Sequence, residues 1–178
     1  MGRPYSQSNG VSAQQFAAAM GGYALSAGDR IAVAVSGGGD SMALVLLLAE
    51  WSAERSVHLT ALTVDHGLRT EAAAEAEQVA AWLTARGIAH RILTWDDGVR
   101  LRGYSGSPQK AARDARYALM ASWCAEHNAS HLFLAHHADD QVETFLIRLT
   151  RGSGVNGLAA MAPATALYGT VLARPLLE

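Results

Sequence analysis

A strand, a glycine-rich turn and a helix follow one another without interruption in the first third of this chain. Residues 31–35 are apolar, Gly37, Gly38 and Gly39 form the turn, and an apolar helix follows from Met42. Glycine lets the backbone approach an anion without Cβ clashes and reach positive φ, and a helix N-terminus presents unpaired N–H groups. This segment therefore predicts a phosphate cradle, with a ligand-free tight turn as the simpler alternative.

The side chains within the turn indicate which type of nucleotide reaction it supports. Ser36 and Ser41 offer hydroxyl donors, and Asp40 offers a carboxylate that can recruit a divalent cation. A Walker loop needs a lysine for the terminal phosphates, but the single lysine of the chain, Lys110, lies far downstream. An aspartate in its place suits a nucleotide whose pyrophosphate leaves intact with Mg²⁺ offsetting the charge. We therefore predict nucleotidyl transfer.

Apolar strand patterns alternate with helical patterns along the rest of the chain. The expected strands are 31–35, 57–64, 89–93, 131–135 and 171–174, and the expected helices are 42–54, 71–85, 109–127 and 139–151, after an N-terminal helix near 11–23 that Gly28 helps to end. This alternation predicts an α/β, Rossmann-like parallel sheet flanked by helices on both faces. Ligands of such sheets bind beyond the carboxyl ends of the strands, where Ser36 and His136 fall.

An acidic cluster follows the strand near 131–135. Asp139, Asp140 and Glu143 open a helix directly after His136 and His137. Helix capping explains one or two acids, at about 0.3–1 kcal/mol each. Three acids at helical spacing form a negative pocket able to hold an ammonium group or a metal. Zinc is a minor alternative, because adjacent histidines lack the spaced ligands of a closed zinc site.

The helix near 109–127 carries two stripes. Its basic stripe consists of Lys110, Arg113 and Arg116, and its apolar stripe of Tyr117, Met120 and Cys124. A solvated charged face is the ordinary explanation for a basic stripe. The loop 100–108 before this helix is rich in glycine and serine and can close over a ligand.

A G-x-G-x-x-G pattern at 152–157 matches the dinucleotide fingerprint, but its context excludes that reading. The fingerprint must follow a strand and open a helix, whereas this one follows a helix. A helix-capping loop and a contact to nucleotide or RNA phosphate, aided by Arg148 and Arg151, both stay open.

Composition limits the class of protein. With 178 residues, 50% of them hydrophobic, the chain can build one domain core, and its net charge of −2 gives no basic surface for wrapping RNA. A lone Cys124 excludes an internal disulfide framework, and no apolar run approaches the ~20 residues of a membrane span. We predict a cytoplasmic protein.

Three motifs together resemble a known family. Ser36–Ser41 resembles the PP-loop of the N-type ATP pyrophosphatases, which have the adenine nucleotide α-hydrolase-like fold and split ATP into AMP and pyrophosphate. Val64–Arg69, and His136–Thr144 followed by Arg151–Gly154, narrow the resemblance to the tRNA(Ile)-lysidine synthetases. The resemblance runs from about the first strand to the end of the chain.

The resemblance implies an ATP- and Mg²⁺-dependent ligase that forms a carbon–nitrogen bond. It adenylates C2 of the wobble cytidine of tRNA(Ile), and free lysine then displaces AMP to give lysidine. The implied catalytic residues are Asp40, Arg116, His137, Asp140 and Glu143, with Arg116 as the transition-state cation and Arg113 as a structural residue. The implied cofactor-binding residues are Ser36, Gly37, Gly38, Gly39, Asp40, Ser41, Asp65, His66 and His136, with Asp40 as the metal ligand.

The expected organisation is an N-terminal extension and helix at 1–25 and a PP-loop catalytic domain at 26–178. Family members continue into further tRNA-binding segments, so the resemblance implies that those segments lie outside this chain. Two alternatives stay open: another PP-loop enzyme, such as a tRNA thiolase or an amidotransferase-fed synthetase, and a regulatory module that binds ATP without catalysis. A single cysteine speaks against sulfur chemistry.

Overall fold

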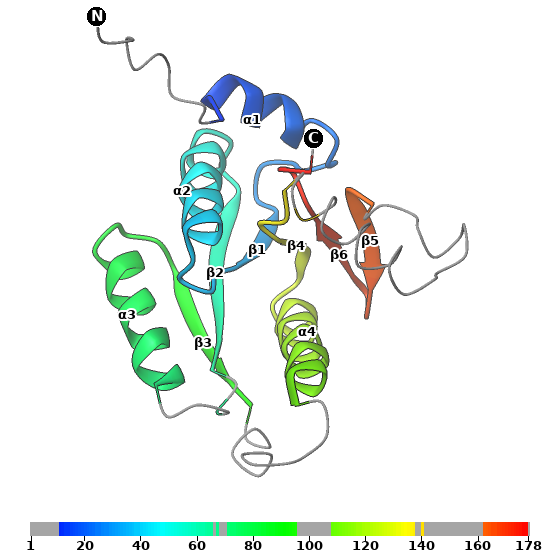
Figure 1. Cartoon of the computed structure of the whole chain (residues 1–178). Helices are drawn as coiled ribbons and strands as arrows, with labels where there is room; N and C mark the ends of the chain where they lie inside the picture. The colour runs from blue at the N-terminus through cyan, green and yellow to red at the C-terminus, as the bar shows by residue number, and fades with distance from the viewer. Residues whose placement is uncertain are drawn as a thin grey trace, which may run out of the picture.

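A computed structural model describes residues 11–65, 67, 71–95, 108–137, 140 and 162–177, with the backbone alone for 108–112. Helices and strands alternate through most of this part (Figure 1). The helices are α1 (Ala13–Met20), α2 (Gly39–Glu54), α3 (Ala72–Thr84) and α4 (Pro108–Glu126). The strands are β1 (Arg30–Ala34), β2 (His58–Asp65), β3 (His90–Thr94), β4 (Ala129–Phe133), β5 (Ala164–Leu167) and β6 (Thr170–Ala173).

The strands form a single sheet in the order β3-β2-β1-β4-β6-β5. All neighbours pair in parallel except β5, which runs antiparallel to β6. The predicted α/β parallel sheet is confirmed. Strand β5 was not predicted. It joins β6 through Tyr168 and Gly169, whose φ angles of 47° and 83° suit a primed hairpin turn.

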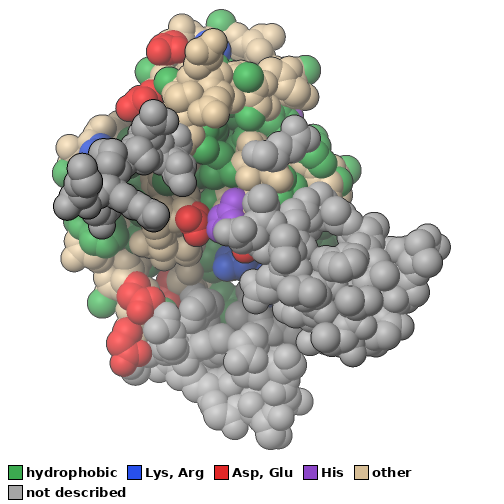
Figure 2. Space-filling model, turned by 45° about the horizontal axis from the view of Figure 1, so that its top comes forward, with side chains coloured by type: hydrophobic (Ala, Val, Ile, Leu, Met, Phe, Trp, Pro, Cys, Tyr) green, Lys and Arg blue, Asp and Glu red, His purple; other side chains and the backbone are tan. Residues whose placement is uncertain are grey.

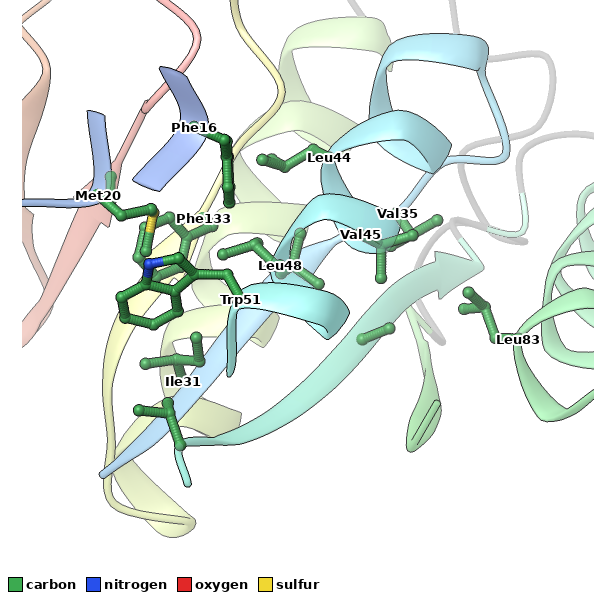
Figure 3. Packing of buried hydrophobic residues seen from close by; sticks show 14 of the residues in the cluster. Phe16, Met20, Ile31, Val35, Leu44, Val45, Leu48, Trp51, Leu83 and Phe133 are labelled. Carbon is green, nitrogen blue, oxygen red and sulfur yellow. The ribbon is translucent and has the colours of Figure 1, made fainter. Parts of the chain in front are cut away.

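Side chains of β1 and of Val35 directly after it alternate between two cores, so both faces of the sheet are buried. Ile31, Val33 and Val35 pack with residues of α1, α2 and α3, whereas Ala32 packs into a second core with α4. Figure 3 shows the first core, in which Phe16, Met20, Leu44, Leu48, Trp51 and Phe133 lie close together. This burial on both faces explains the near-continuous apolar sequence of 31–35.

The N-terminal helix ends earlier than the sequence suggested. Ser12 caps α1, since the Gln15 backbone N–H donates to its hydroxyl, and Gly21 follows the last helical turn. Gly28, which we expected to help end this helix, instead lies in the turn before β1 with φ of 89°. Its N–H donates to the Ser56 carbonyl, 2.8 Å away.

Several predictions fall outside the described residues. They concern the helix 139–151 apart from residue 140, the loops 100–107 and 152–157, and the side chains of His66, Lys110, Asp139 and Glu143. The proposed boundary between 1–25 and 26–178 also stays a prediction. Within the described residues, no helix combines the length and apolarity needed to cross a bilayer.

The single cysteine belongs to the second core. Cys124 is fully buried, and burial raises the pKa of its thiol to about 11. A thiol with such a pKa is almost entirely protonated near pH 7 and is a poor nucleophile. Met120, one helical turn away, is equally buried, so the predicted apolar stripe is confirmed.

Candidate active site

Those predicted site residues that the structure describes converge at the carboxyl edge of the sheet. Ser36 follows β1, Asp65 ends β2, and His136 and His137 follow β4. The end of β6 runs beside β4, since Leu134 N–H donates to the Ala173 carbonyl and His137 pairs with Leu176. This pairing brings Arg174 to the same edge. Figure 2 shows histidine, acidic and basic side chains gathered on this face.

The glycine turn packs tightly against α3. Gly37 has φ of 85°, and a Cβ on it would lie 2.9 Å from Cγ2 of Val79. Both facts require glycine at this position, because a side chain would be strained and would also collide. The conformation of the turn therefore depends on glycine at position 37, as the sequence predicted.

Two hydroxyl groups fix the shape of the turn. The Ser41 hydroxyl donates to the Gly38 carbonyl at 2.8 Å and accepts from the Ser36 N–H at 3.2 Å. Since its only proton is used, the Ser36 hydroxyl is the donor in the 3.2 Å contact between the two oxygens. Ser41 is buried and Ser36 is exposed, so Ser36 can turn towards a phosphate while Ser41 holds the loop.

Within the described residues, no side chain caps the N-terminus of α2. Gly38 is the N-cap residue and offers no side-chain acceptor, so the first N–H groups of α2 are open to an external anion. Asp40, in the first turn, has a side chain that is 71% exposed. The carboxylate can therefore reach a cation bound to phosphates at this helix end.

His137 lies between two carboxylates. Its Nε2 is 3.6 Å from Oδ2 of Asp40 and 3.8 Å from Oδ2 of Asp140. The His137 backbone N–H also donates to Asp140 Oδ2 at 2.9 Å, and the Asp140 N–H donates to the His137 carbonyl at 3.1 Å. Three predicted catalytic residues thus meet in one place. No group of three or more His, Cys, Asp or Glu side chains suited to a metal occurs in the described parts of the chain.

Asp65 forms a turn at the end of β2. Its Oδ1 accepts the N–H of Gly67 at 2.9 Å, which holds the chain just past the strand. The side chain is half-buried at the carboxyl edge, where the sequence placed it. Its expected neighbour His66 lies outside the described residues.

A hydrogen-bond chain between neighbouring strands supports the glycine turn. No pattern in the sequence indicated it. Thr63 donates its hydroxyl proton to the Val35 carbonyl at 2.8 Å, directly before Ser36. His90 Nε2 lies 2.9 Å from the same hydroxyl and must be the donor, because the hydroxyl proton is already used. No spacing pattern links these residues, since Thr63 lies in β2, His90 begins β3 and Val35 directly follows β1.

A positive cluster surrounds His136. Burial lowers the pKa of His136, and Arg174, Arg113 and Arg116 lower it further, while Asp140 raises it. Arg113 and Arg116 lie over the Tyr117 ring, 5.3 and 5.5 Å from its centroid. Sequence analysis assigned roles to both α4 arginines but missed Arg174, because it expected only a strand at 171–174.

Acid is expected to destabilise the folded chain. Burial lowers the pKa of His90, His131 and His136. Below the ordinary histidine pKa of about 6.5, the unfolded chain takes up protons that the folded chain does not, so the free energy of unfolding falls as pH falls. The urea midpoint should be lower at pH 5.5 than at pH 7.5, and His90→Gln should reduce the difference. An equal or higher midpoint at pH 5.5 would contradict this expectation.

These features make a candidate nucleotide site from a glycine turn and a helix N-terminus. Residues 9–178 match the PP-loop domain family of ATP-binding proteins, and the chain belongs to that family. Its fold resembles that of the U34-tRNA thiolase NcsA from Methanococcus maripaludis, solved with its [4Fe-4S] cluster. The TM-score is 0.78 at 20% identity, over 92% of this chain and 56% of the thiolase.

Several proteins named tRNA(Ile)-lysidine synthase are more similar in sequence. The protein from Bradyrhizobium diazoefficiens is 50% identical over 150 residues, which are 83% of this chain and 40% of the relative. The protein from Ruegeria pomeroyi is 49% identical over 148 residues, which are 83% of this chain and 34% of the relative. The chain thus spans about two fifths or less of the length of these relatives.

Proposed function

We propose that this chain is the ATP-binding catalytic part of an enzyme that attaches free lysine to the wobble cytidine of tRNA(Ile). The observation that carries the proposal is the meeting of Asp40, His137 and Asp140 beside an uncapped helix N-terminus. The sequence similarity to lysidine synthases supports the choice of substrates. A cytoplasmic location remains our prediction, as do the further tRNA-binding segments.

In the first step, the C2 oxygen of cytidine attacks the α-phosphorus of ATP. The bond to the β-phosphate breaks and pyrophosphate leaves, while the glycine turn and the α2 N-terminus hold its oxygens. The exposed Asp40 carboxylate fits Mg²⁺, which prefers oxygen ligands and retains several waters. When bound there, Mg²⁺ supplies compensation for phosphate charge.

In the second step, the ε-amine of lysine attacks the adenylated C2 and AMP leaves. A lysine amine has a pKa near ~10.4, so it arrives as an ammonium ion and must lose a proton before it attacks. Asp140 offers a carboxylate for this ammonium, and His137, whose ring lies 3.8 Å away, is placed to orient it or to relay the proton. Glu143 is proposed to assist on sequence grounds alone.

Arg116→Ala is expected to slow adenylation by roughly 100-fold without unfolding the chain. Arg116 makes no ion pair within the described residues and lies over the Tyr117 ring, so its loss removes a cation rather than a structural bridge. Charge stabilisation in a transition state typically contributes on this scale. Single-turnover release of pyrophosphate measures the effect, and Arg86→Ala, just past the C-terminal end of α3, is the control. An unchanged rate would refute the role.

The proposal is tested by incubating the full gene product with ATP, Mg²⁺, purified tRNA(Ile) and lysine. Lysidine in the tRNA, with AMP and pyrophosphate as products, is the expected result. Modification that depends on a sulfur donor in place of lysine would favour a thiolase. ATP that binds but is never cleaved with both substrates present would favour a regulatory module.

A further inference from the structure

Three arginines near His136 have no carboxylate partner among the described residues. Arg113 and Arg116 come from α4 and Arg174 follows β6, and each lies close enough to His136 to affect it electrostatically. Within the described residues, no Asp or Glu oxygen lies at ion-pair distance from any of the three guanidinium groups. The folded chain therefore gathers positive charge that its own described side chains do not neutralise, which is typical of an anion site.

Arg174 is held in place from one side. Its backbone N–H donates to the Pro163 carbonyl at 2.8 Å and to the Tyr23 hydroxyl at 3.1 Å. Its Nη1 donates to the Ala162 carbonyl at 2.8 Å and to the Thr165 hydroxyl at 3.2 Å. The side chain is half-buried, and these contacts leave its Nη2 edge unused within the described residues. A guanidinium held in this way is preorganised to bind a planar anion.

Two buried nitrogens in the same region also have no hydrogen-bond partner in the part of the chain that the structure describes. They are Nε of Arg174 and Nδ1 of His136. A buried polar atom without a partner costs free energy, and such atoms in a folded protein call for an explanation. One of them belongs to an arginine of the cluster and the other to the histidine that the cluster surrounds, which indicates that something other than the described side chains completes this region.

The adjacent residue His137 faces the opposite charge. Its ring lies within 4 Å of carboxylate oxygens of Asp40 and Asp140. Cations thus predominate around His136 and carboxylates around His137, with Asp140 acting on both. A ligand with an amine at one end and a carboxylate at the other matches both clusters, and free lysine carries these groups on either side of a flexible four-carbon stem.

We infer that Arg174, with Arg113 beside it, binds the α-carboxylate of the free lysine whose ε-ammonium lies at Asp140. This inference rests on the proposed function. It adds the residue that distinguishes free lysine from an amine that has no carboxylate. An RNA phosphate is the rival occupant. Lysine is favoured because its ε-ammonium can pair with the Asp40 and Asp140 carboxylates that flank the cluster, whereas a phosphodiester carries no positive group to do so.

The test compares lysine with cadaverine, which has the amines but no carboxylate. In the full gene product, Arg174→Gln should raise the KM for lysine by about tenfold to 100-fold, the usual range for a hydrogen bond to a charged group. Lysine-independent pyrophosphate release should keep its rate. The wild type should strongly prefer lysine to cadaverine, and Arg174→Gln should lose most of that preference.

Thr165→Ala is the matched control, because it removes one structural hydrogen bond of Arg174 and leaves the guanidinium charge. It should keep the lysine KM and the preference over cadaverine. Arg174→Lys keeps the positive charge but loses the paired guanidinium donors, so it should raise the lysine KM less than Arg174→Gln does. If Arg174→Gln does not fold, Arg174→Lys takes its place in the comparison.

The outcomes separate the inference from the function on which it rests. Wild-type protein that makes no lysidine would overturn the proposed function. Wild-type lysidine formation with an unchanged lysine KM and unchanged preference in Arg174→Gln would overturn this inference alone. A raised KM for tRNA, with the lysine KM unchanged, would overturn it in favour of an RNA phosphate. Equal effects of Thr165→Ala and Arg174→Gln on the lysine KM would overturn the inference, because Arg174 would then have only a structural role.

Discussion

Asp40→Asn is expected to lower the rate of tRNA adenylation by roughly 1000-fold or more, since binding of a catalytic metal is worth several kcal/mol. The substitution keeps the shape of the side chain but removes the charge that would hold Mg²⁺. Because the Asp40 side chain is 71% exposed, the free energy of unfolding should change by no more than about 1 kcal/mol. Rapid-quench measurement of pyrophosphate release tests the rate, and urea unfolding tests the stability.

Glu50→Gln is the matched control for Asp40→Asn. Glu50 is an exposed acid on the same helix, beyond the first turn that faces the site. The Glu50→Gln substitution changes the net charge by the same amount as Asp40→Asn, so a general electrostatic effect would slow both variants alike. Retained activity in Asp40→Asn would remove the metal assignment, whereas equal losses in both variants would assign the effect to net charge.

Gly37→Ala is expected to weaken ATP binding at least tenfold and to destabilise the chain. A left-handed φ costs an alanine roughly 1–2 kcal/mol, and its Cβ would also lie 2.9 Å from Val79 Cγ2. The turn can relieve this contact only by moving away from α3, which displaces the N–H groups that face the phosphates. Equilibrium titration with ATP measures the affinity, and thermal unfolding measures the stability.

The double variant Gly37→Ala/Val79→Ala separates the two causes. Val79→Ala removes the colliding methyl group but leaves the φ strain, so it should restore part of the ATP affinity and not all of it. Val79→Ala alone should destabilise the core modestly and leave ATP binding intact. Unchanged ATP affinity in Gly37→Ala would show that the shape of this turn does not determine nucleotide binding.

Local pattern was sufficient to predict the strand, turn and helix around the phosphate cradle. The apolar strand, the three glycines and the apolar helix each act through neighbours in sequence, so the turn at Gly37 and the helix that carries Asp40 could be predicted from the letters alone. The same holds for β2, β3, β4 and β6, whose predicted bounds lie within two residues of those observed.

Features that depend on distant residues were not predictable. Strand β5 is short and its alternation is weak, so only pairing with β6 defines it. The support of Val35 by Thr63 and His90 joins three strands, and Arg174 reaches the site only because β6 continues beside β4. Such contacts arise from strand order, which no motif in the sequence encodes.

The central claim is that the glycine turn orients ATP for attack at its α-phosphorus. The most direct test is to incubate the full gene product with ATP labelled at the α- and γ-phosphates, Mg²⁺, tRNA(Ile) and lysine, and to identify the labelled products. Our account predicts AMP and pyrophosphate in equal amounts, formed only when the tRNA is present. ADP and orthophosphate would contradict it.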